Sequence, residues 1–154
     1  MLHGTAIIEN NTFADNYVTI RASGMRTLGI CSAVIRHNIF YNSIDDSGCA
    51  NIIDYTSNID NLTFECNNVW SIPSDTPMYS GSLSDQTGIN GNISMDPLFC
   101  GEPSSGNYYL QAISPCIALN VPEYCSSIRM GKYPVGCETS TETTSWGNIK
   151  LFDR

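Results

Sequence analysis

The chain is poor in charge. Asp, Glu, Lys and Arg make up 14% of its 154 residues, and only 7 residues are Lys or Arg. With a formal net charge of -8 at pH 7, it has no basic cluster of the kind that contacts a phosphate backbone. No apolar window is long enough to form a transmembrane helix. We therefore predict neither a nucleic-acid partner nor a membrane span.

The sequence also lacks a Cys-x-x-Cys pair, the spacing typical of zinc sites, and an export signal at its start. It nevertheless contains 7 cysteines, a density typical of proteins from an oxidising compartment. We expect two disulfides among the last four cysteines, with the pairing open. These are Cys100, Cys116, Cys125 and Cys137. A cysteine-rich chain without an export signal is expected to be the C-terminal part of a longer protein, with further coils upstream.

Three segments, residues 6–13, 33–40 and 62–69, align without gaps. Apolar residues recur in three columns, and one column contains only Asn. The apolar columns are Ala6, Ala33, Leu62; Ile8, Ile35, Phe64; and Phe13, Phe40, Val69. The Asn column is Asn11, Asn38 and Asn67. Apolar residues two apart line one face of a strand, and Asn tolerates the backbone angles of a tight turn.

The near-constant interval predicts that each segment lies directly over the previous one, as a coil of a solenoid. Asn side chains in register can then form a ladder of amide hydrogen bonds. No i, i+3, i+4 apolar stripe indicates a helix. We predict an all-β protein, a right-handed parallel β-helix of about three coils, with loops over 24–29 and 71–91. The coils occupy residues 1–94, a closing segment 95–137 and a linker and tail 138–154.

The repeat Ile8-Glu9-Asn10-Asn11-Thr12-Phe13 resembles that of the parallel β-helix repeat family in the pectate-lyase superfold. Residues 92–99, 106–110, 114–117 and 130–133 resemble the closing segment of secreted bacterial β-helix proteins. This resemblance implies a right-handed β-helix, a disulfide-stabilised C-terminal cap and a secreted or cell-surface bacterial location. Enzymes of this family are polysaccharide lyases and hydrolases that use clustered Asp residues with Arg or Lys.

Candidate functional residues are few. Asp45 and Asp46 are weak catalytic candidates and also the candidates for a calcium site, although adjacent acidic residues are commonly a solvated turn. No other cofactor or metal is expected. Tyr41 and Trp70 share an outward column with Ala14, so we expect an exposed aromatic pair that stacks on the faces of sugar rings. The alternative is that the loop after Trp70 covers them.

Three functions remain open from the sequence. The first is a non-catalytic binding or surface-display module of an extracellular β-helix, with polysaccharide as a possible ligand. The second is a polysaccharide lyase or glycoside hydrolase whose catalytic coils lie upstream. The third is a structural stalk.

Overall fold

The computed structural model describes residues 5–18, 24–27, 32–41, 44–45, 53–56, 59–72, 78–101 and 105–137. In these ranges the chain forms short β-strands and 3-10 turns, and no α-helix. Cys31, Cys49 and the predicted tail, residues 138–154, lie outside the described residues.

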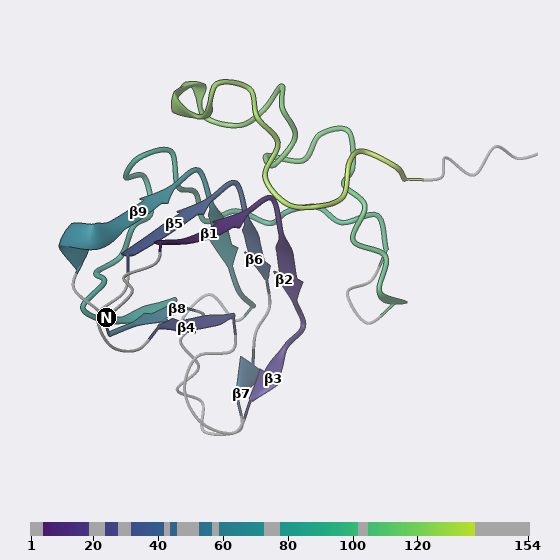
Figure 1. Ribbon diagram of the computed structural model, residues 1–154. Helices are drawn as coiled ribbons and strands as arrows, with labels where there is room; N and C mark the ends of the chain where they lie inside the picture. The colour runs from purple at the N-terminus through teal and green to yellow at the C-terminus, as the bar shows by residue number, and fades with distance from the viewer. Residues whose placement is uncertain are drawn as a thin grey trace, which may run out of the picture.

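The strands assemble into parallel sheets whose members recur once per coil (Figure 1). The first sheet, in the order β1-β5-β9, contains Thr5–Glu9, Ser32–Arg36 and Leu62–Glu65. The second, β2-β6-β10, contains Thr12–Ala14, Ile39–Tyr41 and Asn68–Trp70. The third, β4-β8-β11, contains Met25–Thr27, Ile53–Tyr55 and Tyr79–Gly81. A two-stranded sheet pairs β3, Tyr17–Val18, with β7, Ile44–Asp45.

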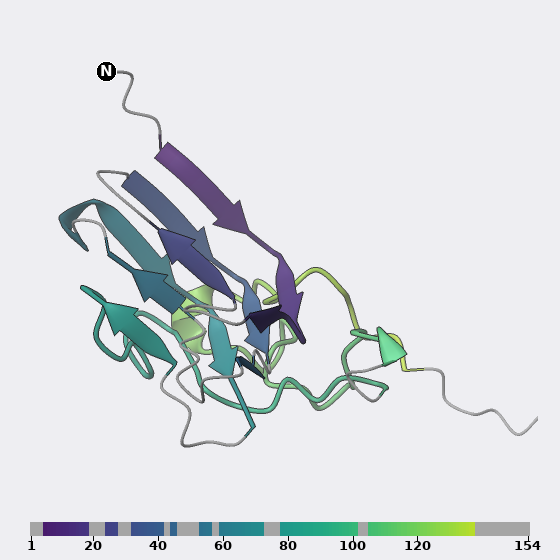
Figure 2. The same cartoon turned by 90° about the horizontal axis from the view of Figure 1, so that it is seen from below.

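The register follows the repeat. Ala6 pairs with Ala33, which pairs with Leu62, and the Ile8 column is aligned in the same way. In the Phe13 column the Phe13 and Phe40 rings stack with centroids 4.9 Å apart. Figure 2 shows the coils following one another along the axis, in the order of their colours. The predicted parallel β-helix of about three coils is confirmed.

Each coil turns between the first and second sheets at a residue with a left-handed backbone. These residues are Asn10, His37 and Cys66, with φ of 56°, 56° and 53°. The next residue is the Asn of the repeat, and its backbone N–H donates to the side-chain oxygen of the Asn one coil later. The bonds are Asn11 to Asn38 (2.9 Å), Asn38 to Asn67 (3.0 Å) and Asn67 to Asn92 (2.9 Å).

Asn92 adds a fourth rung that the repeat alignment did not include. Its side-chain Nδ2 donates to the carbonyls of Phe64 and Ile89, and Ile93 forms a parallel bridge with Asn68. The ladder therefore extends to Asn92, where a fourth coil starts. The closing segment follows directly after it.

Two strands lie in segments that we expected to be loops. Met25–Thr27 forms β4, and Tyr79–Gly81 forms β11 within the predicted 71–91 loop. Tyr79 packs edge-on against Phe64, with centroids 6.0 Å apart, so its side chain belongs to the core. Met25, Ile53 and Tyr79 are register partners in the third sheet, and their apolar side chains pack together in the core.

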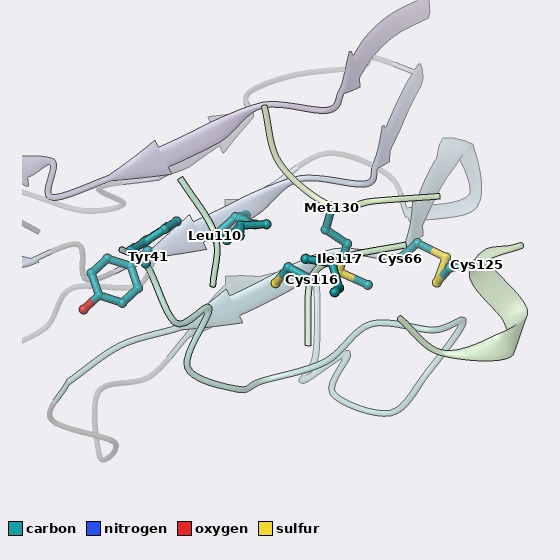
Figure 3. Packing of buried hydrophobic residues seen from close by; sticks show 9 residues of the cluster. Tyr41, Cys66, Leu110, Cys116, Ile117, Cys125 and Met130 are labelled. Carbon is teal, nitrogen blue, oxygen red and sulfur yellow. A yellow bond between two sulfur atoms is a disulfide. The ribbon is translucent and has the colours of Figure 1, made fainter. Parts of the chain in front are cut away.

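Residues 95–137, here called the cap, cover the outer face of the β2-β6-β10 sheet (Figure 1). Leu110, Cys116 and Met130 are fully buried between the cap and this sheet (Figure 3). The Gly131 N–H donates to the His37 carbonyl at 2.7 Å. A Cβ on Gly131 would collide with Ile39, so this glycine lets the cap backbone lie against the sheet.

The expected cysteine set is partly wrong. The disulfides are Cys66–Cys125 and Cys100–Cys137, and Cys116 is a buried free thiol. Cys66 occupies the left-handed turn position of the third coil, where it meets the 3-10 turn Glu123–Cys125 of the cap. Cys116 instead lies beneath the cap, where its sulfur accepts a hydrogen bond from Asn68 Nδ2 at 3.1 Å.

Candidate functional site

The predicted acidic pair lies only partly within the described residues, so its role stays a prediction. Asp45 is the last residue of β7, and Asp46 lies outside the described residues. Within the described ranges, no group of three or more His, Cys, Asp or Glu could hold a metal ion. No helix found there is long and apolar enough to cross a membrane.

The expected exposure of the aromatic pair is wrong for Tyr41. Tyr41 is only 6% exposed, because Phe99 of the cap packs edge-on against it with ring centroids 5.1 Å apart. Trp70 is half-buried in the same cluster, and its Nε1 is buried without a hydrogen-bond partner among the described residues. The outward column is covered as the alternative required, but by the cap in place of the loop after Trp70.

One small hollow, of about 240 Å³, lies where the cap meets the left-handed turn residues of the second and third coils. Arg36, His37, Glu65 and Tyr124 line it beside the Cys66–Cys125 bridge. Arg36 also pairs at 2.9 Å with Glu9, its register partner on the neighbouring strand β1. The Tyr124 hydroxyl donates to Glu65 at 3.3 Å. Arg36, Glu65 and Tyr124 thus already have partners, whereas His37 Nδ1 is buried without a hydrogen-bond partner among the described residues. We interpret the hollow as a structural joint between the coils and the cap.

His37 gives this joint a pH dependence. Burial, and then the nearby Arg36 guanidinium, lower its pKa below the ordinary 6.5, against a smaller opposing effect of Glu9 and Glu65. The unfolded chain therefore binds the proton more readily than the folded chain. The stability that neutral His37 provides is complete above the unfolded pKa and is lost as the pH falls through the folded pKa.

We expect the free energy of unfolding to decrease as the pH is lowered from about 7.5 to about 5.5. Urea denaturation at several pH values measures this decrease. His37→Gln should flatten the profile, whereas His3→Gln, which changes the other histidine, should leave it as in the wild type. An unchanged slope in His37→Gln would show that another group titrates.

Exposed aromatic residues do occur, on the outer part of the cap. A chain of contacting rings runs outward from Tyr41 through Phe99, Tyr108 and Tyr133 to Tyr109. Tyr108 is anchored by its hydroxyl, which donates to Asp15 at 3.0 Å. Tyr109, at the outer end, is 42% exposed. The Tyr109 ring therefore lies at the surface and packs against the rings behind it.

Beside Tyr109 lies an open hollow of about 530 Å³, here called the tyrosine groove. Its lining includes Cys100 and Cys137, Ser105, Asn107, Tyr109 and Gly136. The Cys100–Cys137 bridge, and the bond from the Cys100 N–H to the Tyr109 carbonyl (2.7 Å), hold its walls together. The lining residues that the structure describes carry no charge.

Comparison of the chain with protein-family models, curated proteins and solved structures gives no match. The functional argument therefore rests on the geometry of the coils and the cap.

The tyrosine groove was missed from sequence because its residues lie outside the repeat. Tyr108, Tyr109 and Tyr133 occur in two of the short segments that carry the closing-segment resemblance. A cluster of tyrosines in a segment rich in Gly, Ser and Asn was the available signal, since tyrosine is enriched at binding surfaces.

Proposed function

We propose that this chain forms the closing end of an extracellular right-handed β-helix of the pectate-lyase superfold and serves as a non-catalytic binding or surface-display module. The observation that carries the proposal is the contrast between the two ends of the solenoid. At the far end, Leu83 packs against the core and Asn92 continues the ladder beyond the third coil, whereas the first coil presents a face on which another coil can stack. The two disulfides indicate an oxidising, extracytoplasmic environment.

The first coil exposes the columns that the second coil buries. Ala6 is exposed and Phe13 is half-buried, whereas Ala33 and Phe40 in the same columns are buried. Among the described strands, β1, β2 and β4 each have a paired neighbour on one side only. Such an edge is a template for further strand pairing.

The Asn ladder has a donor-to-acceptor direction, which determines the group that it presents at this face. Each Asn side-chain oxygen accepts the N–H of the Asn in the coil before it, so Asn11 directs the acceptor end of the ladder toward the open face. A further coil with an Asn in register would continue the pattern. We expect upstream coils, or other copies of this chain, to occupy the face.

Sedimentation velocity tests the open face. We expect the chain to self-associate as its concentration rises. Ala6→Lys should suppress association, because it places a charge at an exposed position in the column that faces the coil interior. Ile7→Lys, at the adjacent outward and 66% exposed position, is the matched control and should associate as the wild type does. A concentration-independent wild-type monomer would contradict the proposal.

An enzyme remains the second candidate because of one ion pair. Asp54, on β8, is only 5% exposed and lies 3.2 Å from Arg26 of β4 on the third sheet. If the pair is catalytic, the chain should release reducing or unsaturated ends from polysaccharides, and Asp54→Asn should abolish this release. A binding or display module releases none.

A further inference from the structure

We infer that the tyrosine groove is a binding site for a neutral oligosaccharide, whose sugar ring stacks on Tyr109. The inference rests on the proposed role as a binding module and adds the site and the class of ligand. It concerns a different surface from the open first coil, so the two can fail separately.

Tyr109, the aromatic residue of the described lining, is 42% exposed, and the described residues around it are polar and uncharged or are glycines and disulfide cysteines. Asn107 Oδ1 accepts the Tyr109 N–H at 3.4 Å, and its Nδ2 has no hydrogen bond within the described residues. That amide is a donor at the edge of the groove, whereas the Ser105 hydroxyl already accepts the Asn107 N–H at 3.3 Å. A sugar ring has an apolar C–H face for stacking and hydroxyls for such polar partners, so its chemistry matches this lining.

The negative charge of the chain, a formal -8 at pH 7, selects among polar ligands because it repels anions. An acidic sugar or a phosphate would also lose its hydration without gaining an oppositely charged partner from the described lining residues. Lys132, whose ammonium lies 5.6 Å from the Tyr133 ring centroid, is not among the described lining residues. A neutral glycan carries no such cost.

The ring geometry disfavours a proline-rich peptide. Inserting a ring between two aromatic walls requires a separation of about 7 Å, twice the ordinary contact distance. The Tyr109 and Tyr133 centroids are only 5.3 Å apart, and the rings are tilted by 53°. The two rings contact each other and leave no room for a ligand ring between them. A ligand therefore stacks on the side of Tyr109 that faces away from Tyr133.

The Tyr109 ring is held in place before a ligand binds. An added Cβ on Gly136 would collide with the Tyr109 ring, so glycine at this position allows the ring to lie against the backbone. The ring is supported on another side by Tyr133, which contacts the anchored Tyr108. A rigid aromatic surface loses little conformational entropy on binding.

The test uses the whole chain with its disulfides intact. A glycan array of neutral and acidic oligosaccharides identifies binders, and isothermal titration calorimetry and the aromatic NMR signals of the tyrosines measure binding. Decaproline is titrated as the peptide alternative. Tyr109→Ala should weaken binding of the neutral glycan by at least about tenfold, as truncation of a central aromatic residue does. Tyr109→Phe, which keeps the ring, should retain binding to within about threefold.

Tyr124→Ala is the matched control, because it removes another exposed cap tyrosine that lies beside Glu65 and outside the groove. It should bind as the wild type does. Gly136→Ala should weaken binding by displacing the Tyr109 ring. The inference is overturned if no neutral glycan binds, if Tyr109→Ala binds as well as the wild type, or if acidic glycans or decaproline bind more tightly. Sedimentation of the same variants shows whether the open face still associates, which separates failure of this site from failure of the display role.

Discussion

Removal of the Cys66–Cys125 bridge in C66A/C125A is expected to lower the free energy of unfolding by about 4 kcal/mol. The bridge joins residues 59 apart in the sequence, and it ties the turn of the third coil directly to the cap. Without it, the unfolded chain gains the conformational entropy of a long loop. In Figure 3 this bridge lies at one edge of the buried cluster, with Tyr41 at the other.

Urea denaturation under non-reducing conditions measures this loss. Cys116→Ala is the matched control, because Cys116 is equally buried but forms no disulfide. It should cost only about 1 kcal/mol, as a small truncation in a packed core does. A change of less than about 1 kcal/mol in C66A/C125A would mean that the cap does not depend on this link for its position.

Asn67→Ala is expected to lower the free energy of unfolding by about 3 kcal/mol. Asn67 is fully buried, and its side-chain oxygen accepts both the N–H and the Nδ2 of Asn38. Its own Nδ2 donates to the Ile35 carbonyl and to Asn92 Oδ1. Alanine leaves the donors of Asn38 buried without an acceptor, which costs more than the loss of an exposed hydrogen bond.

Asn16→Ala is the control, since Asn16 is exposed and lies outside the ladder. Its effect should stay within about 0.5 kcal/mol. Equal small effects of the two substitutions in urea denaturation would contradict the stacked register.

The sequence predicted the first two sheets because their residues repeat in chemistry as well as in position. The Ile8 column is buried inside the coil, and the Asn11 column has one hydrogen-bond pattern that each coil must reproduce. The third sheet could not be predicted in the same way. Met25-Arg26-Thr27 and Tyr79-Ser80-Gly81 share only an apolar first residue, which pairs with Ile53 in the core, and one shared position is too little to align two segments in a sequence.

The position of the cap could not be predicted from the repeat. Tyr41 and Trp70 follow the strand alternation outward, and only the tertiary contact with Phe99 shows that this face is covered. The cysteine pairing failed for the same reason. Cys66 was counted with the coils, but its turn position directs it toward Cys125, which is far away in the sequence. The groove at Tyr109 is likewise assembled from segments that are distant from each other along the chain.

Peptide mapping by mass spectrometry, without reduction, tests most directly whether the cap closes the stacked coils as described. We expect one cross-linked pair that contains Cys66 and Cys125, and another that contains Cys100 and Cys137. Cys116 should be alkylated only after unfolding, since burial raises the pKa of its thiol to about 12 and keeps it protonated. A disulfide between Cys116 and Cys125, or rapid alkylation of Cys66 in the native protein, would contradict the account.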